Sequence, residues 1–86
     1  MYKRGKILVR PAIILTIAGS DSGAGAGIQA DVKSISANGG YAVTVITAIT
    51  AQNTKGVQNI FPISSKLVKD QLCSIFADFK VDAVKI

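Results

Sequence analysis

A run of small residues from Gly19 to Gly27 (GSDSGAGAG) is the first segment of this sequence that could bind a ligand. Its glycines permit positive φ angles and let the backbone approach a bound group closely. Because a helical pattern follows, free backbone N–H groups and the helix dipole favour an anion or polar ligand atoms there. Asp21, inside the run, is expected to form an Asx-type turn. The run predicts a polar site but does not identify its ligand.

Two nucleotide-binding motifs compete for this loop. No Gly-Lys-Ser/Thr follows at the spacing of a P-loop. Gly25, Gly27 and Ala30 do have the G-x-G-x-x-A spacing of a dinucleotide fingerprint. However, the preceding strand is predicted to end well before Gly25, and the next strand ends without the acidic residue that holds a ribose. The pattern therefore disfavours both motifs.

Gln52 directly follows a second apolar run, residues 43–50. Ligands of open α/β sheets bind outside the carboxyl ends of the strands, so Gln52 is expected to face the same crevice as the glycine loop. Its amide offers an acceptor and two donors, which match the edge of an aminopyrimidine ring. A turn amide that caps the strand end is the alternative.

Asp31 falls in the first turn of the predicted helix. Its carboxylate either complements the helix dipole or accepts a hydrogen bond from a substrate hydroxyl, and the residues alone leave both open. Cys73 is expected to be a small core residue on the apolar side of a second helix.

Hydrophobic periodicity predicts the elements that position these residues. The expected strands are 12–18, 43–50 and 81–86, the expected helices are 28–38 and 64–79, and 57–63 is a weak extended segment. Alternating strands and helices predict an α/β fold with a parallel sheet. Residues 1–11 are expected to be a basic lead, and residues 12–86 the incomplete N-terminal βαβαβ segment of a larger domain, because no helix closes the last strand.

Composition narrows the class of protein. The formal net charge is +5, but four of the ten basic residues lie in the first ten positions. The others are not interleaved with aromatics, so no nucleic acid partner is expected. No run approaches the roughly 20 apolar residues of a membrane span, and the short run after the lead is interpreted as a strand and not a signal peptide. One cysteine and no histidine exclude an internal disulfide, a zinc cluster and a Ser/His/Asp triad, and favour the cytoplasm.

Two longer runs carry a family resemblance. Residues 15–34 (LTIAGSDSGAGAGIQADVKS) and 45–58 (VITAITAQNTKGVQ) resemble the N-terminal hallmark of hydroxymethylpyrimidine/phosphomethylpyrimidine kinases of thiamine biosynthesis, which are ribokinase-like proteins. The resemblance spans residues 13–86, about the first third of a typical member. The family usually has glycine where Ala24 stands, and the lead is longer than the family pattern.

The resemblance implies a pocket for 4-amino-5-hydroxymethyl-2-methylpyrimidine, in which Gln52 and Asp31 match the substrate-binding glutamine and aspartate of the family. Gly19, Ala26 and the backbone at Thr50 would line the same pocket. It also implies ATP and Mg²⁺ as cofactors, with phosphoryl transfer to the hydroxymethyl oxygen and then to the monophosphate. The base and most ATP contacts of the superfamily lie in later segments, so no catalytic residue and no metal ligand is expected in this chain.

The expected function is thus the substrate-pocket part of that kinase, completed by a complementary C-terminal chain. A high apolar fraction of 49% fits either a piece of a larger domain or a subunit of a homo-oligomer. Two alternatives stay open: a non-catalytic α/β module that binds a small ligand, and a fragment of a pyridoxal or pyridoxine kinase.

Overall fold

The computed structural model describes residues 2–4 and 7–86, with side chains from Arg10 onward. Within the predicted basic lead, two short strands, β1 (Tyr2–Arg4) and β2 (Ile7–Val9), pair antiparallel with each other. The lead expected at residues 1–11 therefore contains a small two-stranded sheet.

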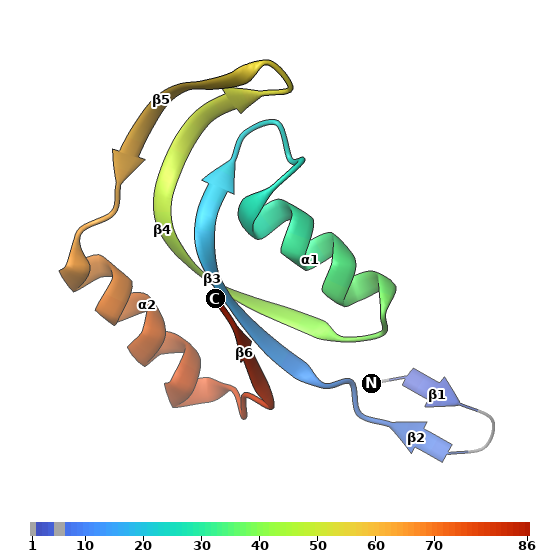
Figure 1. Ribbon diagram of the computed structural model, residues 1–86. Helices are drawn as coiled ribbons and strands as arrows, with labels where there is room; N and C mark the ends of the chain where they lie inside the picture. Colours follow the sequence, from blue (N-terminus) through green and yellow to red (C-terminus); the bar gives the residue numbers. More distant parts are fainter. Residues whose placement is uncertain (1, 5–6) are drawn as a thin grey trace.

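A four-stranded sheet in the order β5-β4-β3-β6 forms the body of the molecule (Figure 1). Its central strand β3 (Ile13–Asp21) pairs in parallel with β4 (Tyr41–Asn53) on one side and with β6 (Ala83–Lys85) on the other. The α/β class and the parallel core are therefore confirmed. β5 (Gly56–Pro62) runs antiparallel to β4, so the weak extended segment predicted at 57–63 is a full strand.

β3 and β4 extend further than their apolar runs predicted. β3 continues to Asp21 where Ala18 was expected to end it, and β4 continues to Asn53 where Thr50 was expected to end it. The extra polar residues belong to the strands because Ser20 and Asp21 still pair with β4, beyond a register shift after Ala18. Strand pairing therefore sets these ends, and apolar character does not.

Two helices lie on opposite faces of the sheet, α1 (Gly27–Ala37) on one and α2 (Ser65–Asp78) on the other (Figure 1). Ser64 caps α2 as predicted, since its hydroxyl accepts a hydrogen bond from a first-turn backbone N–H at 3.1 Å. β6 is shorter than the strand predicted at 81–86, because its pairing with β3 is confined to residues 83–85.

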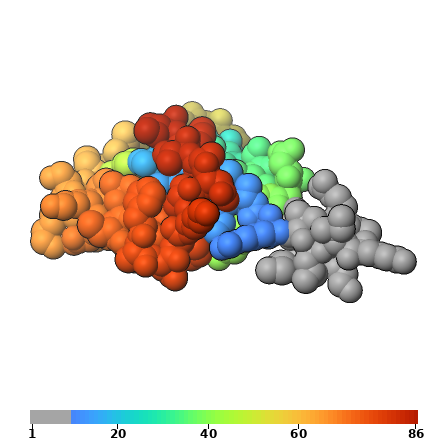
Figure 2. Space-filling view, turned by 90° about the horizontal axis from the view of Figure 1, so that it is seen from below, coloured from blue at the N-terminus to red at the C-terminus, as the bar shows by residue number. Residues whose placement is uncertain are grey.

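The core lies between the sheet and α2. Leu15 and Val45 are fully buried, and Val43 completes the cluster. The apolar stripe of α2 packs against them, so the helix predicted from this spacing faces the sheet as expected. Burial of each such side chain stabilises the fold by about 1.5–3 kcal/mol. In Figure 2, α2 (orange) and the last residues (red) lie next to each other on the face that is seen from below.

Cys73 is exposed, so the prediction that it is a core residue was wrong. Leu72 and Ile75 belong to the stripe that packs on the sheet. One residue advances about 100° around an α-helix, which turns position 73 away from the contact that Leu72 makes.

A side chain of α2 closes part of the outer edge of β4. The Gln71 amide accepts a hydrogen bond from Ile46 N and donates one to Ile46 O, both at 2.9 Å. β5 pairs with β4 only from Ala48 onward. The amide therefore satisfies the backbone groups of Ile46 where no strand partner is present. None of the helices in the described part of the chain is long and apolar enough to cross a membrane.

Candidate functional site

Asp21 holds the glycine loop together from the end of β3. Its side chain is almost fully buried, and one oxygen accepts a hydrogen bond from Gly23 N at 2.7 Å. The other oxygen accepts from Gly25 N at 3.0 Å and from Ala26 N at 2.9 Å. This confirms the predicted Asx-type turn. The carboxylate also occupies the backbone donors that an anionic ligand would need, so the loop favours an uncharged polar ligand.

The start of α1 is tied to the same strand end by Gln29. Its Oε1 accepts a hydrogen bond from Asp21 N, and its Nε2 donates to Ser20 Oγ, both at 2.8 Å. Both polar ends of this amide are therefore satisfied. Gln29 was not predicted from the sequence, although a polar residue in the first turn after a glycine loop is the signal that marks it.

Two loop residues adopt the left-handed backbone conformation. Gly27 has a φ of 59°, and a Cβ there would lie 2.3 Å from Gly19 O. Only glycine fits such an approach of helix start and strand end. Ala24 has a φ of 61°, at the position where the resemblance expects glycine, so this alanine carries backbone strain.

Gln52, at the end of β4, is fixed to the loop through its backbone. The Ser22 hydroxyl donates to Gln52 O at 2.6 Å and accepts from Gln52 N at 2.7 Å. The Thr50 hydroxyl donates to Ser20 O at 2.7 Å and lies 3.0 Å from Gln52 Oε1. A hydroxyl has one proton, and Thr50 donates it to Ser20 O. The contact with Gln52 is therefore a hydrogen bond when the oxygen and nitrogen of the Gln52 amide are exchanged, so that its NH₂ donates to Thr50.

A pocket of about 210 Å³ opens between the loop and the end of β4. Its lining residues are Asp21, Gly23, Gly25, Ala26, Gln52, Asn53 and Thr54. Loop and strand approach closely there, because a Cβ on Gly23 would lie 3.2 Å from both Asn53 Cα and Gln52 O. The pocket lies outside the carboxyl ends of two parallel strands, where ligands of such sheets bind. The structure thus brings the glycine loop and Gln52 to one crevice, as expected.

Asp31 belongs to a second cluster, on the face of the sheet that α1 covers. It is the fifth residue of α1, so the prediction that it lies in the first turn was wrong. Its Oδ2 accepts a hydrogen bond from the buried Thr16 hydroxyl at 2.6 Å. Lys85 Nζ, from β6, donates to both carboxylate oxygens at 3.0 Å. The hydrogen bond from Thr16, and then the hydrogen bond and charge of Lys85, lower the pKa of Asp31, while burial opposes them in part. Asp31 is therefore held as an anion at neutral pH.

The five residues that the resemblance assigned to one pocket occupy different places. Ala26 and Gln52 line the pocket, and Thr50 contacts the Gln52 side chain. Gly19 lies beneath the loop with its carbonyl oxygen against the start of α1. Asp31 is not among the lining residues and faces Thr16 and Lys85.

Lys85 is a residue of interest that the sequence analysis missed. It stands in the predicted last strand, but its pairing with Asp31 depends on the register between β6 and β3. Sequence periodicity does not fix that register.

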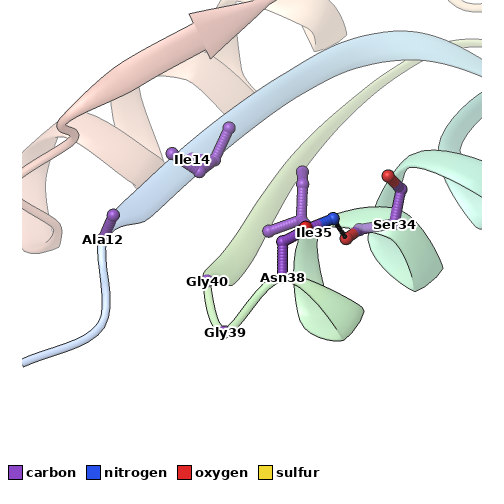
Figure 3. A pocket seen from close by; sticks show the side chains of 7 residues that line it. All are labelled: Ala12, Ile14, Ser34, Ile35, Asn38, Gly39 and Gly40. Atoms are coloured by element: carbon purple, nitrogen blue, oxygen red, sulfur yellow. Dashed lines mark hydrogen bonds between the residues drawn. The ribbon is translucent and has the colours of Figure 1, made fainter.

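A second pocket, of about 290 Å³, lies at the amino end of β3 (Figure 3). Its wall combines Ile14 and Ile35 with the end of α1, where Asn38 Nδ2 donates to Ser34 O at 2.8 Å. The residues that line it carry no titratable side chain, so it offers no acid–base chemistry. Within the described residues, no group of His, Cys, Asp or Glu side chains could hold a metal ion.

Fold and site together define the N-terminal part of a ribokinase-like α/β fold, with a crevice at the strand ends. Residues 21–86 match the family model described as phosphomethylpyrimidine kinase. This chain belongs to the phosphomethylpyrimidine kinase family, which confirms the resemblance seen in the sequence.

Relatives and solved structures agree with this assignment. The chain is 59% identical over 75 residues to hydroxymethylpyrimidine/phosphomethylpyrimidine kinase of Rhizobium meliloti, covering 87% of this chain and 28% of the relative. The Escherichia coli protein of the same name is 54% identical over 72 residues, covering 84% and 27%. The crystal structure of phosphomethylpyrimidine kinase from Clostridium difficile is 56% identical with a TM-score of 0.84, covering 87% of this chain and 32% of that one.

A pyridoxal kinase has a similar fold. The ADP complex of Bacillus subtilis pyridoxal kinase is 40% identical with a TM-score of 0.77, covering 87% of this chain and 29% of that one. The chain spans between 27% and 32% of the length of the four proteins compared. In the kinase domain it corresponds to the N-terminal part.

Proposed function

We propose that this chain supplies the substrate pocket of a kinase that phosphorylates 4-amino-5-hydroxymethyl-2-methylpyrimidine and its monophosphate. The observation that carries the proposal is that Gln52 lines a pocket together with residues of the glycine loop at the strand ends. Because Asp21 already occupies the loop N–H donors, the pocket suits an uncharged ring with donors and acceptors along its edge. An aminopyrimidine has this pattern.

The substrate contacts are assigned residue by residue. Gln52 pairs with the ring edge, and Thr50 and Ser22 hold it in place. The family pattern assigns to Asp31 a hydrogen bond from a substrate N–H or O–H, and to Gly19 and Ala26 a close approach of the ring to the backbone. Of these three residues, Ala26 lines the pocket.

Phosphoryl transfer needs a base for the attacking hydroxyl and cations that neutralise the charge of the phosphates. In this proposal, neither comes from this chain. ATP serves as the phosphoryl donor with Mg²⁺, and both bind mainly to the part of the kinase domain beyond the matched segment. A structure of Staphylococcus aureus pyridoxal kinase, 31% identical with a TM-score of 0.77, holds AMP-PCP and pyridoxal. We place residues 12–86 in the N-terminal part of such a domain, completed by a C-terminal segment or chain. Cytoplasmic location and a homo-oligomer belong to the same proposal.

Isothermal titration of the chain with the hydroxymethyl pyrimidine, with Gln52→Leu as the variant, tests the proposal. Loss of hydrogen bonds to the ring edge costs about 1–3 kcal/mol, which weakens binding roughly 5- to 150-fold. Gln58→Leu is the matched control, because Gln58 is exposed on β5 and its amide contacts only the neighbouring backbone of Gly56 among the described residues. Equal affinity of the unchanged chain and Gln52→Leu would refute the assignment.

Pyridoxal is the second candidate ligand, favoured by the structural likeness to pyridoxal kinases. Titration with pyridoxal in the same assay separates the two, since tighter binding of one ring than of the other favours that ring as the substrate class. The non-catalytic module is tested by adding ATP and the C-terminal part of a family member. Pyrimidine binding without any phosphorylation in that mixture would favour the module.

A further inference from the structure

We infer that Lys85 is a positioning residue of the substrate site, which fixes the Asp31 carboxylate in one orientation as a hydrogen-bond acceptor for the substrate. This inference rests on the proposed function and adds to it a residue from the opposite edge of the sheet. It is carried by the geometry of three side chains that come from β3, α1 and β6.

The strand register brings these side chains together. Thr16 of β3 and Lys85 of β6 are direct partners in the parallel ladder, so their side chains project from the same face of the sheet. That face carries α1, and Asp31 reaches down from the helix to meet both. The cluster therefore forms only when β6 is paired in this register.

The contacts around Asp31 leave it one defined acceptor position. A carboxylate has about four lone-pair sites. Oδ2 receives Thr16 Oγ1 and Lys85 Nζ, while Oδ1 receives Lys85 Nζ alone. The fork of Lys85 prevents the carboxylate from turning, so the free site on Oδ1 keeps one direction.

The other charged groups near α1 have different partners. Lys33, on the same helix, donates to Ala24 O at 3.0 Å. Asp21 is engaged by the N–H groups of the loop. In the part of the chain that the structure describes, Lys85 is thus the cation paired with Asp31.

Removal of the ammonium has two effects on the carboxylate. Its side chain is only 16% exposed, and such a group without a cation takes up a proton more readily. The carboxylate also loses the restraint on its rotation that comes from the contact of Lys85 Nζ with both of its oxygens. The loss of this restraint reduces the fraction of molecules in which the free acceptor site of Asp31 points toward the substrate.

The test compares Lys85→Met, Lys85→Gln and Lys85→Arg in the 86-residue chain. The readouts are the carboxyl pKa of Asp31 by NMR titration and the affinity for the hydroxymethyl pyrimidine by calorimetry. We expect Lys85→Met and Lys85→Gln to raise the pKa and to weaken binding about tenfold or more. Lys85→Arg keeps the charge and should retain both values. Because methionine keeps an apolar stem without the charge, a loss in Lys85→Met beside retention in Lys85→Arg would not follow from a purely structural role of the lysine stem.

Lys66→Met is the matched control, since it removes the exposed ion pair of Lys66 with Asp70 on α2. It should change neither readout. Unchanged affinity in Lys85→Gln, alongside weakened binding in Gln52→Leu, would overturn the inference and leave the proposed function intact. Absence of pyrimidine binding by the unchanged chain would overturn both. If Lys85→Met fails to fold, as judged by its NMR spectrum, the comparison of Lys85→Gln with Lys85→Arg still tests the inference.

Discussion

Two carboxylates beside or at the end of β3 are stabilised in different ways. Asp21 is surrounded by backbone N–H groups from residues two to five positions ahead of it. Asp31 depends on side chains that lie 15 and 54 positions away in the sequence. The first arrangement is complete once the loop closes, whereas the second needs β3, α1 and β6 in place. The loop is therefore a local structure, and the Asp31 cluster reports on the assembled sheet.

Gly27→Ala should have the largest effect, because it disturbs the glycine loop. Alanine at a φ of 59° is strained, and its Cβ would lie 2.3 Å from Gly19 O. Together these effects should lower the free energy of unfolding by about 3 kcal/mol or more. Urea denaturation followed by circular dichroism measures the change. Gly19→Ala is the control, because a Cβ there meets nothing closer than 3.7 Å. Similar losses in the two variants would contradict the close approach of loop and strand.

Acidification should destabilise the cluster of Asp31, Thr16 and Lys85. The pKa of Asp31 is lowered in the fold, so its ionisation stabilises the protein above the unfolded pKa of about 3.9, and this stability is lost as pH falls through the lower folded pKa. Asp31→Asn should therefore flatten the fall in unfolding free energy between about pH 5 and pH 2. Urea denaturation across that range gives the profile. Asp70→Asn, which removes an exposed pair, should retain the slope of the unchanged chain, and parallel profiles for all three proteins would count against the cluster.

Ala24→Gly is the smallest expected effect, and it is stabilising. Left-handed backbone costs alanine about 1–2 kcal/mol, while glycine loses about 0.5–1 kcal/mol more in chain entropy on folding. The net gain should be about 0.5–1 kcal/mol in unfolding free energy. Ala30→Gly, within α1, should instead lose about 1 kcal/mol. Thermal melts of the two variants give the signs, and destabilisation by Ala24→Gly would show that the loop strain is relieved elsewhere.

Local chemistry could be predicted from the sequence. The turn at Asp21, the cap at Ser64 and the alternation of strands and helices each depend on residues close together in the chain, and the structure confirms them. The crevice shared by the loop and Gln52 also follows, because carboxyl ends of parallel strands meet at one edge of a sheet.

Long-range pairing could not be predicted in the same way. β5 lacks the long apolar run of the buried strands in its sequence, GVQNIFP, and each of its residues is exposed. It is a strand because β4 extends far enough to pair with it. The partner of Asp31 required the register of β6 against β3. Cys73 was misplaced because a stripe defined by spacing has edges that only packing determines.

The Gln71 amide on Ile46 has a consequence for cooperativity. It makes α2 the neighbour of β4 in the hydrogen-bond ladder as well as its neighbour in the apolar core. Detachment of the helix would leave the Ile46 N–H and C=O groups without partners at a sheet edge, where another chain could pair with them. Helix and strand are therefore expected to open together, so that the edge is not uncovered by fluctuations of the helix alone.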